Sequence, residues 1–341
     1  MLSLTEHHTQ THRTLALGLE EVSARFHAEL QSDLPTVNRL AEHVERFRGK
    51  MLRPTLVLCA SLAAYPQRKD DPTFQEWLTV VATVAEMVHM ATLVHDDILD
   101  EAEMRRRGAT INHLRGNEAA VMLGDYLISH AYHLCSAIPL PAASRAIASA
   151  TNTVCEGELL QLHHRDDWEL SERTYFEIIR RKTASLCGVC CRMPAVLASG
   201  DPEGGLEPSA ARLFDFGQKL GVAFQIVDDV LDLTGDPVEV GKTLGRDLAK
   251  GKLTLPLIHH LKGLDEVERR AQIAELRDSP DEAAIGRLRT RLAEGQSLDY
   301  TRDWAGRLVA DAKQALTNGL PETQARQILL DMADAVLSRR Y

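Results

Sequence analysis

The sequence predicts an all-α protein that consists of one large domain. The helix-forming residues Ala, Leu, Glu and Arg dominate, and apolar residues recur at positions i, i+3, i+4 and i+7 in most windows. No alternating run of β-branched residues bounded by hairpin turns is present in the sequence. The chain has 341 residues and is 44% hydrophobic, which is ample for a large core.

Two long helices stand out, and short breaks separate the remaining ones. The long periodic segments are residues 80–104, "VVATVAEMVHMATLVHDDILDEAEM", and residues 210–233, "AARLFDFGQKLGVAFQIVDDVLDL". Breaks rich in Pro, Gly or Asp occur at "YPQRKDDP", "AIPLPAAS", "SGDPEGGLEPS", "TGDPVEVGKTLG" and "RDSPDEAA". None of them looks like a flexible linker. We therefore expect a single domain over residues 1–341, with about a dozen helices and with residues 1–20 loosely ordered.

The composition argues against several classes of protein. The formal net charge is -10, whereas nucleic-acid binding needs clustered Lys and Arg. The six cysteines are scattered and do not suggest a disulfide framework, as is usual in a reducing compartment. No signal peptide is visible, and no run approaches 18 consecutive apolar residues. The sequence therefore predicts a cytoplasmic protein without a membrane anchor.

Two similar aspartate clusters, "LVHDDILD" and "QIVDDVLD", follow apolar stretches far apart in the sequence. Asp96 and Asp100 are four residues apart and share one helix face, where like charges cost roughly 0.2–0.5 kcal/mol. Two clusters of the same form suggest that a cation neutralises them. Mg²⁺ is the natural candidate, because it takes one or two carboxylates and leaves positions for water and substrate phosphate. Solvated helix turns are the alternative.

Basic segments occur in the same acidic chain, at "GKMLRP", "MRRRG", "RRKTASL" and "GKTLGRDLAKGKLTLPL". Lys binds phosphate as a point charge, and Arg binds it with a planar fork. The "GKTLG" stretch is not a nucleotide-binding P-loop, because it lacks the GxxxxGK[ST] pattern and follows no predicted strand. Aspartates and basic groups together predict a site for a diphosphate with several Mg²⁺ ions.

These motifs resemble the trans-isoprenyl diphosphate synthases, also called polyprenyl synthetases. The resemblance runs from about residue 49 to about residue 260, through "GKMLRP", "EMVHMATLVHDDILDEAEMRR", "GNEAAVMLGDYLI", "RRKTASL", "FQIVDDVLD" and "GKTLGRDLAKGKLTLPL" in the family's order. It implies a helical bundle around a deep central cavity, usually as a homodimer. It also implies condensation of an allylic diphosphate with isopentenyl diphosphate, with about three Mg²⁺ ions per active site, for which Mn²⁺ can substitute.

The resemblance implies a role for each matching residue. Those implied to ligate Mg²⁺, directly or through water or neighbouring groups, are Asp96, Asp97, Asp100, Asp228, Asp229 and Asp232. Those implied to bind the allylic diphosphate are Arg105, Lys182, Gln225, Lys242 and Lys252. Those implied to bind isopentenyl diphosphate are Lys50, Arg53, His89 and Arg106. Lys182, Thr183 and Gln225 are the implied catalytic residues, with Thr183 and Gln225 placed where the family steadies the developing allylic cation.

One departure from the family pattern concerns the arginines after the first aspartate cluster. The family commonly has two arginines followed by Gly, whereas here Arg107 intervenes before Gly108. Counting from Asp96 keeps Arg105 and Arg106 in the usual positions and makes Arg107 surplus. A one-residue shift would instead give their roles to Arg106 and Arg107.

Product length in this family depends on the residues beneath the first aspartate cluster. Val88, Ala91 and Thr92 lie one to two helical turns before Asp96, and none of them is aromatic. The resemblance therefore implies a product of about C30 to C50, with Tyr132 on the next helix as a later floor, unless Tyr132 is an ordinary core residue. A product of this length would partition to membranes, so transient membrane contact is expected at product release.

Three other activities fit parts of the pattern. A farnesyl or geranylgeranyl diphosphate synthase would make a shorter product. A class I terpene cyclase shares the helical fold, but it would lack the full "DDVLD" motif and would not need "GKMLRP". A non-catalytic partner subunit would usually lose the aspartates, and both clusters are intact here.

Three smaller features favour structural interpretations. The spacing of Cys187, Cys190 and Cys191 predicts core packing rather than a zinc site. The "QLHHRDDW" segment is expected to be a solvated helix end rather than a ligand cluster. Arg339 and Arg340 are expected to belong to a frayed tail.

Overall fold

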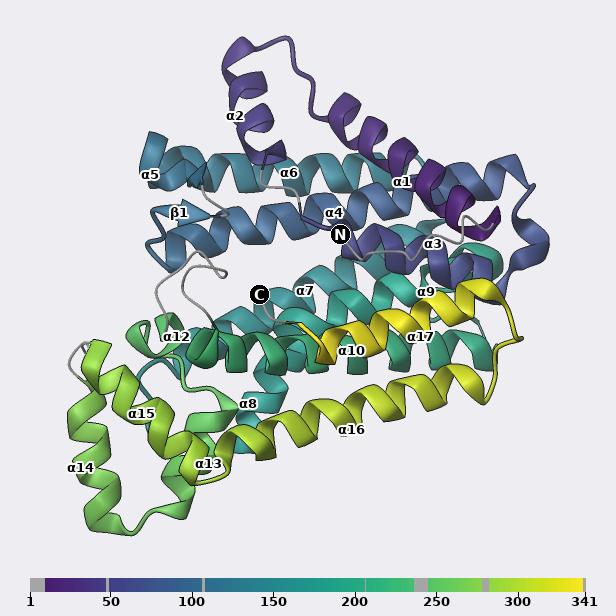
Figure 1. Ribbon diagram of the computed structural model, residues 1–341. Coiled ribbons are helices and arrows are strands. Elements are labelled where there is room, and N and C mark those ends of the chain that lie inside the picture. Colours follow the sequence, from purple (N-terminus) through teal and green to yellow (C-terminus); the bar gives the residue numbers. More distant parts are fainter. Residues whose placement is uncertain are drawn as a thin grey trace. The chain divides into compact units, whose positions relative to one another are not determined.

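The structure is a computed structural model and describes residues 10–46, 49–105, 108–205, 207–235, 245–277 and 282–339 (Figure 1). Most of these residues are helical, which confirms the predicted all-α class. The first helices and strands are α1 Gln10–Glu29, α2 Pro35–Glu45, α3 Leu52–Ala64, η1 Pro66–Arg68, α4 Pro72–Leu99, β1 Met104–Arg105, β2 Gly108–Ala109, α5 Ile111–Arg115, α6 Asn117–Ser136 and α7 Pro141–His163. The following ones are α8 Glu172–Ile179, η2 Arg180–Ala184, α9 Ser185–Ser199, α10 Pro208–Thr234, α12 Arg246–Ala249, α13 Leu255–Gly263, α14 Glu266–Arg277, α15 Glu282–Glu294, α16 Ser297–Thr317 and α17 Gln324–Leu337.

The contacts within the chain divide it into two compact units. The first unit comprises Met1–Thr151, Leu186–Gly217 and Ala315–Asp331. The second unit comprises Asn152–Ser185, Gln218–Gln314 and Met332–Tyr341. Residues 10–20, which were expected to be loosely ordered, form the first half of α1.

Helix α4 is the central helix of the first unit. It begins at Asp71, whose side chain accepts a hydrogen bond from the Phe74 N–H at 3.1 Å, and Pro72 occupies the first helical turn. The middle of α4 is buried on all faces, because every residue from Leu78 to Val88 is buried and most of them are apolar. It packs against α1, α3 and α6, and it runs beside α6 in Figure 1.

Among the described residues, α4 is also the one helix that is long and apolar enough to cross a membrane by length and composition. Within its most apolar stretch, however, 78% of the residues are buried inside the protein. Burial on this scale is the pattern of a core helix, which passes the same test.

The first unit also contains a short hairpin that the sequence did not predict. Met104 pairs with Ala109, and Arg105 pairs with Gly108, in antiparallel register. Each strand has only two residues. That length is too short to produce the alternating pattern by which strands are recognised.

The cysteine group belongs to the core of the first unit. Cys187, Cys190 and Cys191 are free thiols with 3% exposure or less, and burial raises the pKa of each. Helix α10 approaches them at Gly217, where a Cβ atom would lie 2.4 Å from the Cys187 carbonyl oxygen. The prediction of core packing is confirmed.

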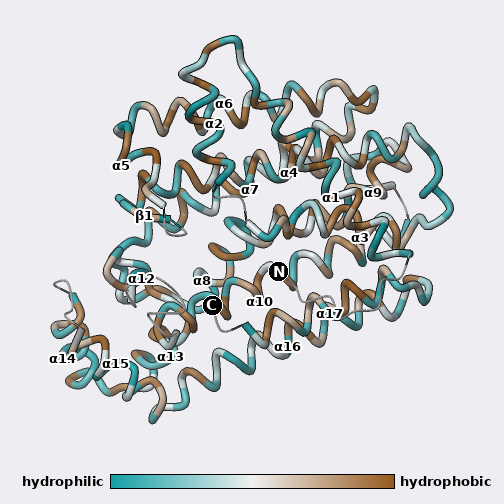
Figure 2. Tube along the Cα trace, turned by 45° about the horizontal axis from the view of Figure 1, so that its top comes forward, coloured by the Kyte–Doolittle hydropathy of each residue, from teal (hydrophilic) through white to brown (hydrophobic). Residues whose placement is uncertain are grey.

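The second unit has its own hydrophobic core, which includes residues of α8, α10, α13, α15 and α16. Helix α16 shows how the sequence specifies this packing. Leu298, Thr301, Ala305, Val309 and Ala312 are buried at intervals of three or four residues. Figure 2 shows hydrophilic and hydrophobic residues alternating along this helix, as expected when one face is buried.

Candidate active site

The predicted site residues form two groups, one in each compact unit. The first unit holds the first aspartate cluster, the "GKMLRP" segment and the residues assigned to product length. The second unit holds the second aspartate cluster and the residues assigned to catalysis. Arg106, Arg107 and Lys242 lie outside the described residues, so their roles stay predictions.

The first aspartate cluster lies at the C-terminus of α4. Asp96 and Asp97 occupy the last turn, and Asp100 is the C-cap residue. Asp96 and Asp100 are half-buried, whereas Asp97 is only 6% exposed. A helix C-terminus carries a partial negative charge, and carboxylates placed there add to it. This end of α4 is therefore suited to a cation.

Helix α4 ends because the chain enters a left-handed turn. Glu101 has a φ of 47°. Its N–H donates to the Ile98 carbonyl at 3.1 Å, and the Ala102 N–H donates to the Asp97 carbonyl at 2.8 Å. These two bonds form a Schellman motif, in which Gly is the usual left-handed residue. The apolar periodicity continues beyond this point, but the turn stops the helix at Leu99.

Replacement of Glu101 by Gly is expected to raise the free energy of unfolding by about 0.5–1 kcal/mol. A left-handed side chain costs roughly 1–2 kcal/mol, and the greater freedom of Gly in the unfolded chain offsets about 0.5–1 kcal/mol of this gain. Urea denaturation measures the difference. Glu101→Ala removes the charge but keeps the Cβ atom, so it should give little gain. Equal gains from both variants would assign the effect to charge and not to backbone strain.

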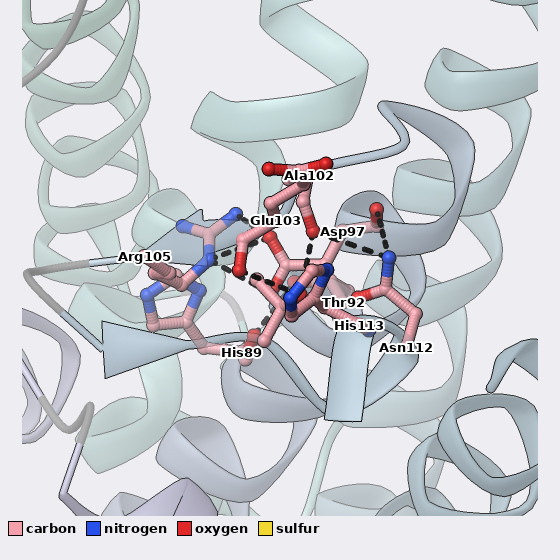
Figure 3. Close-up of polar contacts among 9 residues, drawn as sticks. His89, Thr92, Asp97, Ala102, Glu103, Arg105, Asn112 and His113 are labelled. Atoms are coloured by element: carbon pink, nitrogen blue, oxygen red, sulfur yellow. Dashed lines mark hydrogen bonds and ion pairs between the residues drawn. The ribbon is translucent and has the colours of Figure 1, made fainter. Parts of the chain in front are cut away.

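The loop after α4 is fastened to the helix end by two side chains. The Asn112 amide donates to the carbonyl oxygens of Asp97 at 3.2 Å and Ala102 at 3.1 Å (Figure 3). The Thr110 hydroxyl donates to the Ala102 carbonyl at 2.5 Å. Side chains commonly complete the hydrogen bonds that a helix terminus leaves open. Here they fix the geometry of the turn from Asp97 to Ala102 that ends α4.

Arg105 forms an ion pair with Asp97. The Arg105 Nε atom lies 2.9 and 3.1 Å from the two carboxylate oxygens, and its Nη2 atom lies 2.8 Å from Oδ1 (Figure 3). Burial raises the pKa of Asp97, and Arg105 acts in the opposite direction. The sequence assigned Arg105 to a diphosphate and did not predict this pairing. The ion pair fixes the guanidinium beside the aspartate turn.

The "GKMLRP" segment forms the N-terminus of α3. Lys50 is exposed before the helix, Met51 is its N-cap with a φ of 53°, and Arg53 lies in its first turn. The Arg53 Nε atom is buried, and no residue in the described ranges accepts a hydrogen bond from it, although buried polar atoms are normally paired. A helix N-terminus also favours anions. The segment is therefore suited to a phosphate group.

The residues assigned to product length lie on the packed helices α4 and α6. Val88 and Ala91 are fully buried. Thr92 is half-buried, and its hydroxyl donates to the carbonyl of His89 at 2.7 Å. The side chains of His89 on α4 and Tyr132 on α6 are half-buried too.

In the second aspartate cluster, on α10, Asp228 has the most exposed carboxylate. Its side chain is 53% exposed, and its Oδ1 atom accepts a hydrogen bond from the Arg339 guanidinium at 3.0 Å. The guanidinium lies 4.0 Å from the centre of the Phe224 ring. The prediction of a frayed tail is therefore wrong for Arg339, because an ion pair and a cation–π contact hold it against α10.

Asp229 faces the interior. It is 3% exposed, its Oδ2 atom accepts from the Tyr175 hydroxyl at 2.6 Å, and its Oδ1 atom accepts from the Gln225 amide at 2.8 Å. Burial holds the pKa of Asp229 well above its usual range, and the nearby Asp247 adds to this effect. Burial and the Asp229 carboxylate likewise raise the pKa of Tyr175. The Tyr175 hydroxyl is the donor of the 2.6 Å hydrogen bond.

Asp232 forms hydrogen bonds with the backbone at the start of α12. Its two oxygens accept the backbone N–H groups of Arg246 at 3.3 Å and Asp247 at 3.1 Å, at the start of α12. Burial raises the pKa of Asp232, and these two hydrogen bonds oppose the shift. The three aspartates therefore differ in their surroundings, and Asp228 is the one best placed to meet a metal ion.

A cavity of about 90 Å³ lies within the second unit. It is lined by all three residues assigned to catalysis, Lys182, Thr183 and Gln225. Asp229 and Lys252 also line it. These residues lie far apart in the sequence. Sequence analysis assigned each of them to the active site from its own motif. Further polar lining residues are Gln161, His164, Tyr175, Asp247 and Thr254.

Lys182 and Thr183 lie in a π-helical turn, η2, between α8 and α9. Such turns occur frequently at functional sites, because the extra residue redirects the side chains. The Lys182 ammonium forms an ion pair with Glu158 and a hydrogen bond of 2.9 Å with the Gln161 Oε1 atom. Helix α7 thus sets the position of this lysine.

Gly157 allows α7 to approach the π-helical turn closely. A Cβ atom at this position would lie 2.4 Å from the Lys182 backbone nitrogen and 2.8 Å from the Arg181 Cβ atom. Real Cβ atoms are essentially never found so close to other atoms. Any larger residue would therefore push the turn that carries Lys182 away from α7.

The "QLHHRDDW" segment lies at the C-terminal end of α7, as the sequence predicted, and its residues make specific contacts. The His164 Nδ1 atom lies 2.7 Å from the Asp167 Oδ2 atom, and His164 lines the cavity. The Asp166 N–H donates to the Gly251 carbonyl at 2.8 Å. The segment therefore holds the turn that precedes Lys252.

Within the described ranges, no three His, Cys, Asp or Glu side chains converge closely enough to hold a metal ion by themselves. Mg²⁺ usually takes one or two protein carboxylates and completes its shell with water and phosphate. Asp96, Asp100 and Asp228 offer carboxylates of this kind.

Sequence reasoning missed Tyr175, Asp247 and Gly157. Tyr175 precedes Lys182 by seven residues, a helical spacing that could have indicated a shared face. Gly157 interrupts a helical pattern, and an isolated Gly there often marks a packing requirement. No signal separates Asp247 from a solvated aspartate.

Comparison with known proteins identifies the family. A family model described as Polyprenyl synthetase matches residues 34–303. The chain is 34% identical over 324 residues to an octaprenyl diphosphate synthase from Haemophilus influenzae, and this covers 95% of the chain and 94% of that protein. A solved decaprenyl diphosphate synthase from Rhodobacter capsulatus has a TM-score of 0.86 and 32% identity, and the match covers 97% of this chain and 99% of that one. A polyprenyl synthase from Caulobacter crescentus CB15, complexed with calcium and isoprenyl diphosphate, has a TM-score of 0.84 and 32% identity, with 97% and 98% covered. These matches confirm the resemblance seen in the motifs, and the chain belongs to the polyprenyl synthetase family.

Proposed function

We propose that this chain is a trans-polyprenyl diphosphate synthase. It condenses an allylic prenyl diphosphate with isopentenyl diphosphate, head to tail and all-trans, and repeats the step to a product of about C30 to C50. The observation that carries the proposal is the cavity in which Lys182, Thr183 and Gln225 meet. The octaprenyl and decaprenyl synthases among the relatives support the range of product lengths.

The chemical difficulty is to break a C–O bond and form an allylic cation and diphosphate. Basic side chains and hydrogen-bond donors stabilise the negative charge that develops on the leaving diphosphate. Those proposed for this task are Arg105, Lys182, Gln225, Lys242 and Lys252. Two observed features support them: Arg105 is held in place by Asp97, and Lys182 is held by Glu158 and Gln161. A fixed cation loses little free energy to reorganisation when charge develops.

Divalent cations are proposed to bind at both aspartate turns, at about three Mg²⁺ ions per active site, with Mn²⁺ as a substitute. When bound, they neutralise charge on the diphosphate and act as Lewis acids. Asp96, Asp100 and Asp228 are the proposed direct ligands. The contacts of Asp97, Asp229 and Asp232 with protein donors suit support of the site through water or neighbouring groups.

Isopentenyl diphosphate is proposed to bind at the N-terminus of α3. Lys50 and Arg53 supply positive charge there, and His89 and Arg106 complete the set. The buried Nε atom of Arg53 would gain an acceptor from a diphosphate oxygen. The allylic cation must meet the alkene and not water, so an apolar, closed environment favours the reaction.

The domain organisation, oligomeric state and location are proposed from the resemblance to the family. We propose that residues 1–341 act as a single synthase domain and that the protein works as a cytoplasmic homodimer. No membrane anchor is proposed. A long polyprenyl product is apolar, so transient membrane contact would serve its release.

The experiment that tests the proposal is an assay of the purified chain with Mg²⁺, isopentenyl diphosphate and each allylic primer. Products of about C30 to C50 are the expected result. Products of C15 or C20 would correct the length but keep the reaction. A hydrocarbon or alcohol formed from the allylic diphosphate alone would identify a cyclase. No condensation with any primer would reject the synthase as a homomeric enzyme.

Ala91→Tyr is expected to shorten the product, and Tyr132→Ala is expected to lengthen it. An aromatic ring at position 91 would obstruct a chain growing along α4, whereas loss of the ring at position 132 would remove a later obstacle. Because Ala91 is fully buried, the larger residue also costs roughly 1–3 kcal/mol of stability. Radiolabelled product chromatography gives the lengths, and thermal melts show that each variant is folded at the assay temperature. Unchanged lengths in both variants would contradict the product-length assignment.

A further inference from the structure

A set of hydrogen bonds in the second unit links the hydrophobic core to two of the proposed catalytic residues. The Tyr175 hydroxyl donates to Asp229 at 2.6 Å, the Gln225 amide donates to the same carboxylate at 2.8 Å, and the Thr183 hydroxyl donates to the Gln225 oxygen at 3.1 Å. The residues come from α8, α10 and η2. We call this set the tyrosine relay. All four of its side chains line the same cavity.

The carboxylate of Asp229 serves as the junction of the relay. It is 3% exposed, and each of its oxygens already accepts a hydrogen bond from a protein donor. A buried carboxylate without such donors would be costly. In this arrangement Asp229 orients Gln225 rather than facing the solvent.

The orientation of Gln225 matters because its amide has two chemically different ends. The nitrogen can only donate and the oxygen can only accept. Asp229 takes the nitrogen, so the Gln225 oxygen is directed to the Thr183 hydroxyl. If the amide turned over, it would place N–H donors, with their partial positive charge, where the oxygen now lies.

Tyr175 is itself firmly held. It is 3% exposed, and its ring packs edge-on against Phe176 at 5.4 Å between centroids. The Phe176 ring in turn packs against Trp304 at 4.9 Å. These rings belong to or pack on the hydrophobic core of the second unit. The hydroxyl of Tyr175 therefore has a fixed position from which to hold Asp229.

We propose that Tyr175 is a positioning residue, which acts through Asp229 to hold the Gln225 amide with its oxygen toward Thr183 and the cavity. This inference rests on the proposed function, in which Thr183 and Gln225 steady a developing allylic cation. Two oxygen atoms with partial negative charge, fixed before the reaction, stabilise a cation without reorganisation. Tyr175 does not itself touch the reacting atoms.

The test begins with Tyr175→Phe, which removes the hydroxyl and keeps the ring. It is expected to lower kcat about tenfold, the scale of one lost hydrogen bond to a charged group. The KM for isopentenyl diphosphate should change by less than about twofold, because the relay does not contact this substrate in the proposed scheme. Tyr300→Phe is the matched control. Tyr300 also donates its hydroxyl to a carboxylate, that of Glu172 at 2.7 Å, but it does not line the cavity, so its kcat should be unchanged.

A double-mutant cycle with Gln225→Ala separates positioning from general packing. Since Tyr175 acts through the Gln225 amide, Tyr175→Phe should have little further effect on kcat once that amide is absent. The proposal is overturned if Tyr175→Phe leaves kcat at the wild-type value. It is equally overturned if the loss is about tenfold in both backgrounds.

A readout without turnover distinguishes the relay from the proposed function. In protein labelled with ¹⁵N-glutamine, the side-chain NH₂ signal of Gln225 is identified by its loss in Gln225→Ala. Tyr175→Phe should shift this signal and speed its hydrogen exchange, and Tyr300→Phe should not. If the Gln225 signal responds in this way but the protein forms no condensation product, the proposed synthase activity is rejected and the relay is retained. An unchanged Gln225 signal in Tyr175→Phe would reject the relay even in an active synthase.

Discussion

Gly157→Ala is expected to lower kcat about a hundredfold. The added methyl group would lie 2.4 Å from the Lys182 backbone nitrogen, so α7 and the π-helical turn must separate. The Lys182 ammonium would then lose its position relative to Glu158 and Gln161. A displacement of about 1 Å in a catalytic group can cost about a hundredfold in rate. Overpacking also costs roughly 1–3 kcal/mol of stability. Steady-state kinetics and urea denaturation measure the two effects.

Gly306→Ala is the matched control for this substitution. Gly306 lies inside α16, and a Cβ atom there would meet nothing within 4 Å. Ala is the better helix former, so this variant should gain about 0.5–1 kcal/mol and keep its activity. If Gly157→Ala behaved like Gly306→Ala, the close approach of α7 to the π-helical turn would have no part in positioning Lys182.

Asp96→Ala and Asp228→Ala are each expected to lower condensation activity by about 10²–10³-fold. Each variant removes a carboxylate that we propose as a direct ligand of Mg²⁺, and so removes stabilisation of the leaving diphosphate. Residual activity should need a higher Mg²⁺ concentration than the wild type. Activity is measured over a Mg²⁺ titration, and far-UV circular dichroism should show unchanged helix content.

Asp299→Ala provides the control for loss of an aspartate as such. Asp299 lies on α16, its side chain is 72% exposed, and its partner is the neighbouring Arg302. Exposed pairs of this kind contribute little to stability, so this variant should match the wild type. Full activity of Asp96→Ala at ordinary Mg²⁺ concentrations would falsify the metal assignment of the first cluster.

The sequence could predict the features whose signals are local. The helices that carry the aspartates were expected over residues 80–104 and 210–233, and they are observed as Pro72–Leu99 and Pro208–Thr234. Their long apolar periodicity produced this agreement. The prediction that Lys182, Thr183 and Gln225 share a site depended on family motifs, and the three residues do line one cavity.

The sequence could not predict the partners of the site residues. Tyr175 and Asp229 are 54 residues apart, and Asp228 and Arg339 are 111 residues apart. No periodicity or motif connects positions so distant, since only the tertiary fold brings them together. The end of α4 was missed for a different reason. An isolated Glu carries no turn signal, although Glu101 adopts the left-handed conformation that usually requires Gly.

The burial of α4 has a consequence for how product length can evolve in this protein. Val88 and Ala91 have no exposed surface, so under the proposed function they both pack within the first unit and form the small-residue surface that the growing chain passes. Close-packed interiors do not accept a new ring without adjustment nearby. A single substitution here that changes product length should therefore also lower the stability of the protein. Compensating changes on α6 or α3, which pack against α4, should restore that stability.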